Sequence, residues 1–150
     1  MASTFSQARP ISGEQVDLGK LVWAGPLAIV AAVAGNLVVR FIAAALLNPA
    51  PEFLPLGWAP PILFTFGGVL GAVIVFGLIG RFARRQPIAL FRRVALIALV
   101  VSLIPNVLLL FNPQSAPFPG ATAANFLALS LMHVVAWAIS VTVLTRFARR

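Results

Sequence analysis

The sequence predicts an all-α membrane protein in which four transmembrane helices form one bundle. Of its 150 residues, 61% are hydrophobic and only 9% are charged, and the mean hydropathy is +1.02. A soluble domain has about a quarter charged residues, and one of this size cannot bury so much apolar surface. The apolar residues also fall into four long stretches, which suit a bilayer better than a globular core.

Each apolar stretch reaches the roughly 20 residues that a helix needs to cross the hydrocarbon layer. Backbone groups in lipid must be hydrogen-bonded internally, and the stretches lack the alternation of barrel strands, so we expect helices. Residues 1–18 are polar and lack the basic start of a signal peptide, so we expect a polar tail that is not cleaved off and a first helix that is retained. The predicted spans are about 21–47, 62–80, 88–111 and 121–145.

The basic residues predict the orientation of the four helices. Ten of the eleven Lys and Arg residues precede the first span, lie in the connection 81–93 or end the chain. The positive-inside rule then places both termini of this multi-pass chain in the cytoplasm. The other two connections, 48–61 and 112–120, have no basic residue and hold eight of the twelve prolines, which predicts short, semi-rigid turns.

The two halves of the chain share landmarks in the same order. The segment AVAGNLVVRF (32–41) aligns with SLIPNVLLLF (102–111), and the second and fourth spans both run into RFARR, at 81–85 and 146–150. A duplicated helical hairpin would produce this order. The alternative is a chance similarity between apolar helices that end in arginine, because the offset drifts from 70 to about 65 residues.

The fourth span reads NFLALSLMHVVAWAISVTVLTRFARR, and the third begins FRRVALIALVVSLIPN. These segments resemble a bacterial, actinobacterial-type family of small four-helix integral membrane proteins known only as a domain of unknown function. The resemblance is best over about residues 88–146. It implies a four-span plasma-membrane protein and carries no activity with it.

His133 is the only histidine and lies near the middle of the fourth span, about 18 Å from either end. Ionisable groups at this depth often mark function, and Trp137 follows one turn later, so a haem, chlorin or quinone contact is one hypothesis. The alternative, which we favour, is a neutral histidine that hydrogen-bonds a neighbouring helix. A metal site needs three or four ligands. The chain has no Cys and no second His, and the spans contain no Asp or Glu, so we expect no metal and no cofactor.

Other polar side chains inside the spans predict hydrogen bonds between helices. Counted from the non-basic ends, Asn106 and Asn125 lie about five residues in, and Ser102 and Ser130 about ten. We therefore expect two hydrogen-bonded layers between the third and fourth helices, while Asn36 supplies a polar group in the first. A path for a polar substrate is the less favoured interpretation.

Small residues predict close helix packing on two spans, because they let backbones approach where lipid supplies no hydrophobic force. The pattern leaves open whether the partner helix belongs to this chain, to a second copy or to a larger complex. It also predicts that leucine is tolerated less well at Gly71 than at Gly80. The residues are Gly67, Gly68 and Gly71 in the second span, and Ala28, Ala32 and Gly35 in the first.

Two further residues interrupt the apolar pattern. Arg40 lies nineteen residues beyond Leu21, about 28 Å along a helix, so it reaches the outer interface, either by snorkelling or in an ion pair with Glu52. Pro105 removes a helix hydrogen bond and predicts a kink in the third span.

The connection RFARRQPIALFRR interleaves arginines with apolar residues. Anionic lipid head groups attract such segments, and this explains the basic charge without nucleic acid. The arginines expected at the lipid surface are Arg81, Arg84, Arg85, Arg92 and Arg93.

The residue inventory disfavours an enzyme, because an activated nucleophile with its base, or a pair of catalytic carboxylates, cannot be assembled inside the spans. Two function classes remain. The first is a non-catalytic accessory or scaffolding subunit that packs through its Gly/Ala faces against itself or a larger complex. The second is a small ligand-handling bundle for a lipid, quinone, pigment, haem or small solute, which would use His133 and the Asn/Ser layers.

Overall fold

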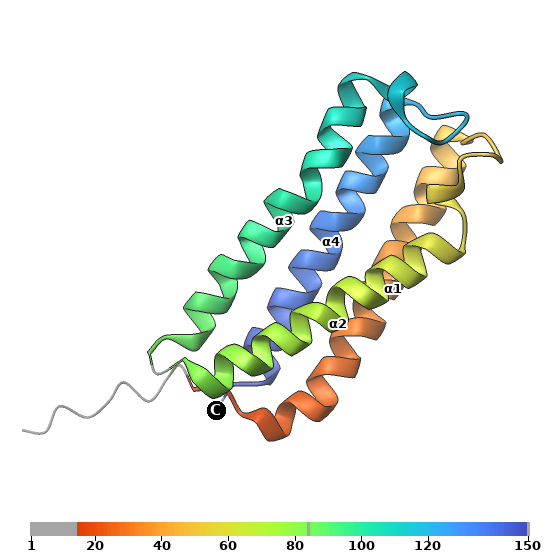
Figure 1. The fold of residues 1–150 in the computed structure, drawn as a ribbon. Helices are drawn as coiled ribbons and strands as arrows, with labels where there is room; N and C mark the ends of the chain where they lie inside the picture. Colours follow the sequence, from red (N-terminus) through yellow and green to blue (C-terminus); the bar gives the residue numbers. More distant parts are fainter. Residues whose placement is uncertain (1–14, 84, 150) are drawn as a thin grey trace, which may run out of the picture.

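The computed structural model describes residues 15–83 and 85–149, and within them the chain forms four long helices packed together (Figure 1). All four are long and apolar enough to cross a membrane, and the described part contains no β-strand. The predicted fold class is confirmed. The helices are α1 (Leu18–Leu47), α2 (Ala59–Phe82), α3 (Pro87–Phe111) and α4 (Ala123–Phe147), with short 3-10 turns η1 (Leu54–Leu56) and η2 (Pro113–Ser115).

The helix ends differ from the predicted spans by a few residues because local chemistry sets them. α2 begins three residues early, since Pro60 and Pro61 lie in its first turn, where a missing N–H leaves no hydrogen bond unmade. α4 begins after Thr122, whose hydroxyl accepts from the backbone N–H of Asn125 at 3.2 Å. α3 continues as one helix through Pro105.

The packing order of the helices is α3, α4, α1, α2. α4 packs against both α1 and α3, and α1 packs against both α4 and α2, while α2 makes smaller contacts with α3 and α4. In Figure 1, α2 crosses in front of α4 and α1. α3 contacts mainly α4, and none of its most apolar 18-residue stretch is buried inside the fold. The protein therefore has a packed centre of α1 and α4 and a peripheral helix that offers most of its surface to the surroundings.

Two clusters of buried side chains form the core. The larger one joins all four helices and includes an edge-to-face pair of Phe76 and Phe91, whose ring centroids are 4.8 Å apart. The smaller one lies at the end where the proline-rich connections meet, and there Phe53 packs edge to face against Phe126 at 5.8 Å. Core packing therefore anchors the connection between α1 and α2 on α4.

The residues before α1 pack against the rest of the protein. The backbone N–H of Asp17 donates to the carbonyl of Ala148 at 2.9 Å, and Val16 forms an isolated antiparallel bridge with Arg149. Val16 is 8% exposed and lies over Gly80. The predicted polar tail thus ends earlier than residue 18, while its residues 1–14 lie outside the described part of the chain.

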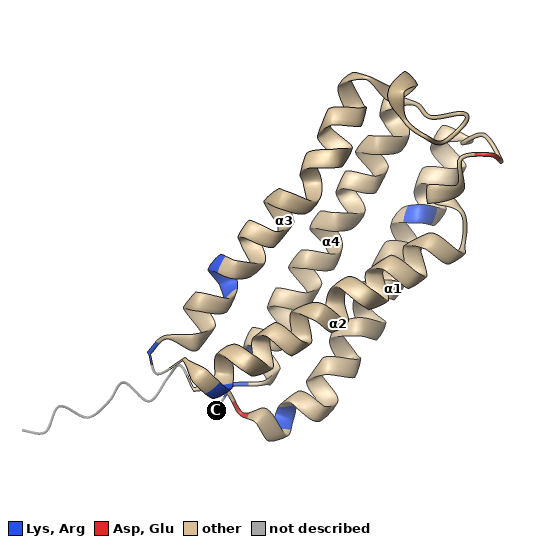
Figure 2. Ribbon diagram, viewed as in Figure 1, with Lys and Arg blue, Asp and Glu red and all other residues tan. Residues whose placement is uncertain are grey.

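Charge is distributed unevenly along the helix axes. Most described Lys and Arg residues gather where α1 and α3 begin and α2 and α4 end, which we call the basic end (Figure 2). Arg40 is the exception, because it lies in the last two turns of α1, close to the connection to α2 that carries Glu52. The expected lipid-facing residue Arg84 falls outside the described residues.

Candidate functional site

One ring nitrogen of His133, Nδ1, has two polar neighbours and can hydrogen-bond only one of them, because a neutral imidazole nitrogen either donates or accepts. Nδ1 lies 2.9 Å from the carbonyl oxygen of Leu129, one turn earlier on α4, and 3.4 Å from Nδ2 of Asn106 on α3. A carbonyl only accepts, so the shorter contact places a proton on Nδ1. Nε2 then carries a lone pair, and no hydrogen bond to it forms within the described part. The half-buried ring therefore hydrogen-bonds its own helix and lies beside Asn106 of α3, and a hydrogen bond from His133 to a neighbouring helix stays a prediction.

Trp137 shares the His133 side of α4 but not its hydrogen bonds. Its indole Nε1 is buried and has no hydrogen-bond partner among the described residues. No group of three His, Cys, Asp or Glu side chains that could hold a metal ion occurs in the same residues. Among the described residues, His133 therefore has no cluster of His, Cys, Asp or Glu side chains with which to share a metal ion.

The two expected polar layers between α3 and α4 are not formed, and this part of the prediction was wrong. The hydroxyl of Ser102 donates to the carbonyl of Leu99 at 2.8 Å, and that of Ser130 to Phe126 at 2.9 Å, so each serine bonds its own helix. Asn125 donates from Nδ2 to the carbonyl of Gly120 at 3.3 Å. A nearby backbone carbonyl is within reach of a helical serine whatever the neighbouring helix does, and Asn125 is engaged at the helix cap.

The shortest side-chain hydrogen bond between helices joins α1 to α2. Nδ2 of Asn36 donates to Oγ1 of Thr65 at 2.8 Å, and both residues are buried. The amide Oδ1 of Asn36 is buried without a hydrogen-bond partner in the described part. Thr65 was missed by the sequence interpretation, although it is the only hydroxyl-bearing residue within the predicted span 62–80. Asn36 and Asn106, which align in the proposed repeat, each contact the helix that follows their own.

Arg40 holds the connection between α1 and α2 in place. Its Nε donates to the carbonyls of Leu56 and Gly57 at 3.1 and 3.3 Å, and its guanidinium lies 3.6 Å from the centre of the Trp58 ring. No ion pair with Glu52 forms in the described structure, so that alternative was wrong. Arg40 binds these carbonyls instead of Glu52 because η1 places them next to the end of α1. A sequence pattern does not predict this geometry.

The glycines and alanines divide into an inward and an outward set. On α1, Ala28 and Ala32 are fully buried, and a Cβ added at Gly35 would lie 2.8 Å from Cδ1 of Ile139 on α4. On α2, an added Cβ at Gly67, Gly68 or Gly71 would meet nothing within 4 Å. The small residues of α1 thus line an interface within the chain, while the glycine triplet of α2 faces away from it.

This division reverses the expected ranking of two glycines. A Cβ at Gly80 would lie 2.7 Å from Cγ1 of Val16, whereas one at Gly71 would lie in open space. Within the chain, Gly80 is therefore the residue that close packing requires. The sequence interpretation gave this role to Gly71 because the packing of Val16 against α2 is a contact between segments far apart in the chain.

The arginines expected at a lipid surface behave differently from one another. Arg81, Arg85 and Arg93 are exposed. Arg92 is also exposed, but its Nη2 reaches α4 and donates to Oγ1 of Thr145 at 3.5 Å. Arg92 thus bridges the two helices, beside a cavity of about 430 Å³ that Arg146, on α4, also lines.

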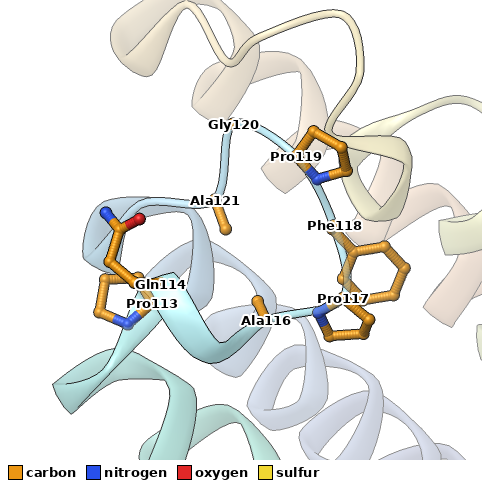
Figure 3. Close-up of a pocket in the computed structure, with 8 residues that line it drawn as sticks. All are labelled: Pro113, Gln114, Ala116, Pro117, Phe118, Pro119, Gly120 and Ala121. Atoms are coloured by element: carbon orange, nitrogen blue, oxygen red, sulfur yellow. The ribbon is translucent and has the colours of Figure 1, made fainter.

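A second cavity, of about 500 Å³, lies at the opposite end, where residues 113–121 curl into an open ring (Figure 3). The side chains of Ala116 and Ala121 point into it, and Phe118 lies at its rim. Gln114 is its only polar side chain and points away from the hollow.

Comparison with known proteins identifies a family and no activity. A family model described as a family of unknown function (DUF6069) matches residues 16–150. No curated protein and no solved structure matches the chain.

Proposed function

Because the chain belongs to DUF6069, a family of unknown function, we propose a role from its geometry: a non-catalytic accessory or scaffolding subunit of a bacterial plasma-membrane assembly. The subunit associates through the outward glycine face of α2, defined by Gly67, Gly68 and Gly71. Its basic end faces the cytoplasm, in accord with the positive-inside rule.

The observation that carries this proposal is the contrast among the glycines of the helices. At the glycines that face another segment, an added Cβ would lie only 2.7–3.1 Å from the nearest atom, so little or no space is left for it. The glycines of the triplet have nothing within 4 Å. Gly67 and Gly71 are four residues apart and share one side of α2, and such pairs let two helix backbones approach closely in lipid. A helix of a second copy or of a larger complex would fit this face.

Association through α2 is tested by adding bulk to it. We expect Gly71→Leu to abolish association in mild detergent. Light scattering would then show the loss of self-association, and mass spectrometry of the eluted complex would show the loss of a co-purifying partner. The matched control is Ala98→Leu, which adds the same bulk at an exposed position of α3. Equal behaviour of both variants, with unchanged particle mass, would reject the α2 interface.

The orientation has its own test. A reporter that is active only in the periplasm, fused after Arg150, should be silent, and the same reporter placed in the connection 112–122 should be active. The reverse pattern would show that the basic end faces the periplasm, which would refute the proposed orientation.

One observation favours the second class, a bundle that handles a haem, pigment, quinone or other small ligand. Nε2 of His133 has no hydrogen bond within the described part and is the nitrogen a ligand would use. The purified protein would then carry a visible absorption band that His133→Gln removes while the helical circular dichroism is unchanged. Colourless wild-type protein purified from its native membrane would exclude haem and pigments.

A further inference from the structure

We infer that the groove between α3 and α4 at the basic end is a binding site for one anionic phospholipid. The groove holds the cavity of about 430 Å³ bordered by Arg92 and Leu96 from α3 and by Trp137, Val141 and Arg146 from α4. This volume lies within the range of small-molecule sites. The site does not depend on the α2 interface proposed above, because it lies on two other helices.

The mouth of the cavity is arranged for an anion. Arg92 and Arg146 approach it from different helices, and no acidic residue lines it. The hydroxyl of Thr145 donates to the carbonyl of Val141 at 2.7 Å and accepts from Arg92 at 3.5 Å, which holds the Arg92 side chain across the groove. Guanidinium groups bind phosphate oxygens through paired N–H donors, so two of them around one cavity favour a phosphate over a neutral head group.

The depth of the groove matches one lipid leaflet. Arg146 and Trp137 are nine residues apart on α4, which is about 13 Å at the helical rise, and half of the hydrocarbon layer is about 15 Å. Arg92 lies nineteen residues before Phe111, or about 28 Å, and so lies at the hydrocarbon boundary. A phosphate at the arginines would therefore place its acyl chain along the Trp137 and Val141 side of the groove.

The groove is open to the bilayer from the side. Leu96 is 50% exposed, and no residue of the most apolar stretch of α3 is buried inside the fold. An acyl chain can therefore enter from the surrounding lipid without any separation of the helices. A free anion would use only the arginines and leave the apolar walls uncovered, and this is why the occupant is a lipid.

Tryptophan quenching reports occupancy directly. Trp23→Phe and Trp58→Phe leave Trp137 as the only indole, and both keep an aromatic ring where the native contacts with Phe147 and Arg40 are made. The protein is placed in nanodiscs of phosphatidylcholine with increasing mole fractions of chain-brominated phosphatidylglycerol. We expect half-maximal quenching of Trp137 at a mole fraction at least fivefold lower than with brominated phosphatidylcholine.

Arginine variants assign the preference to the groove. Arg146→Gln should reduce the preference for phosphatidylglycerol about fivefold, as expected for one basic side chain at an anionic surface. Arg146 makes no hydrogen bond or ion pair to the described residues, so the variant should fold, and circular dichroism checks this. The matched control, Arg93→Gln, removes the same charge from an exposed residue beside Arg92 that does not line the cavity, and it should leave the preference unchanged.

Three outcomes would overturn the site. The first is equal quenching by both brominated lipids, and the second is an equal loss of preference in Arg93→Gln and Arg146→Gln, which would mean a diffuse charge effect. The third is relief of phosphatidylglycerol quenching by millimolar inorganic phosphate at constant ionic strength, which would mean a free-anion site. Native mass spectrometry should independently retain one phosphatidylglycerol on the wild type and less on Arg146→Gln.

Discussion

Replacing Gly80 of α2 by alanine should lower stability, whereas the same change at Gly71 should not. A Cβ at Gly80 would lie 2.7 Å from Cγ1 and 2.8 Å from Cβ of Val16. Ordinary carbon contacts are about 3.5–4.0 Å, so Val16 would have to move by roughly 1 Å. Its Cβ is attached to the backbone and cannot rotate away, so the chain itself must shift.

The cost of that shift follows from what holds the segment. Asp17, the next residue, donates its N–H to Ala148 at 2.9 Å, and Val16 itself is 8% exposed. Overpacking in a tight site costs about 1–3 kcal/mol, and a weakened backbone hydrogen bond about 0.5–1.5 kcal/mol. The higher helix propensity of alanine offsets about 1 kcal/mol of these costs, so we expect Gly80→Ala to lower the free energy of unfolding by about 1–3 kcal/mol. Gly71→Ala has free space and should be neutral or raise it by up to about 1 kcal/mol.

The assay is unfolding in mixed micelles of mild detergent and dodecyl sulfate, followed by circular dichroism. Protein is kept dilute enough for light scattering to show a single chain, which separates packing within the chain from association. Equal midpoints for the two alanine variants, or a larger loss at Gly71, would refute the reasoning, because the contacts of Gly80 would then carry no energetic consequence.

Substitutions at three further residues test individual side chains by the same unfolding assay. Thr65→Val should cost about 0.6–2 kcal/mol, because it removes the hydrogen bond of Asn36 inside the membrane, and the loss should vanish in an Asn36→Leu background. Arg40→Gln should cost about 1–2 kcal/mol through the lost carbonyl and ring contacts. A loss no greater than that of Arg93→Gln would show that these contacts of Arg40 do not stabilise the connection. His133→Gln should be tolerated and His133→Leu should cost less than about 1 kcal/mol, since the Asn106 contact is long; a large loss in both would assign the ring a greater packing role.

The number and extent of the helices follow from the sequence because bilayer thickness imposes a length that apolar residues alone satisfy. Local chemistry then adjusts the boundaries, as the prolines at the start of α2 and Thr122 before α4 illustrate. The gathering of basic residues at one end of the helices also follows directly from their positions in the chain. These features depend on segments read one at a time.

Which side of each helix faces which neighbour was decided only by the tertiary structure. Hydropathy is nearly uniform around these helices, since lipid and protein interior are equally apolar, so no polar stripe marks the inward side. The sequence therefore placed Gly71 in a packed seam when it faces outward, and paired Ser102 with Ser130 when each bonds its own helix. The sequence also did not predict that Arg40 binds the carbonyls of η1 instead of Glu52, or that Arg92 binds Thr145 on α4. Both contacts join segments that are far apart in the chain and that only the fold brings together.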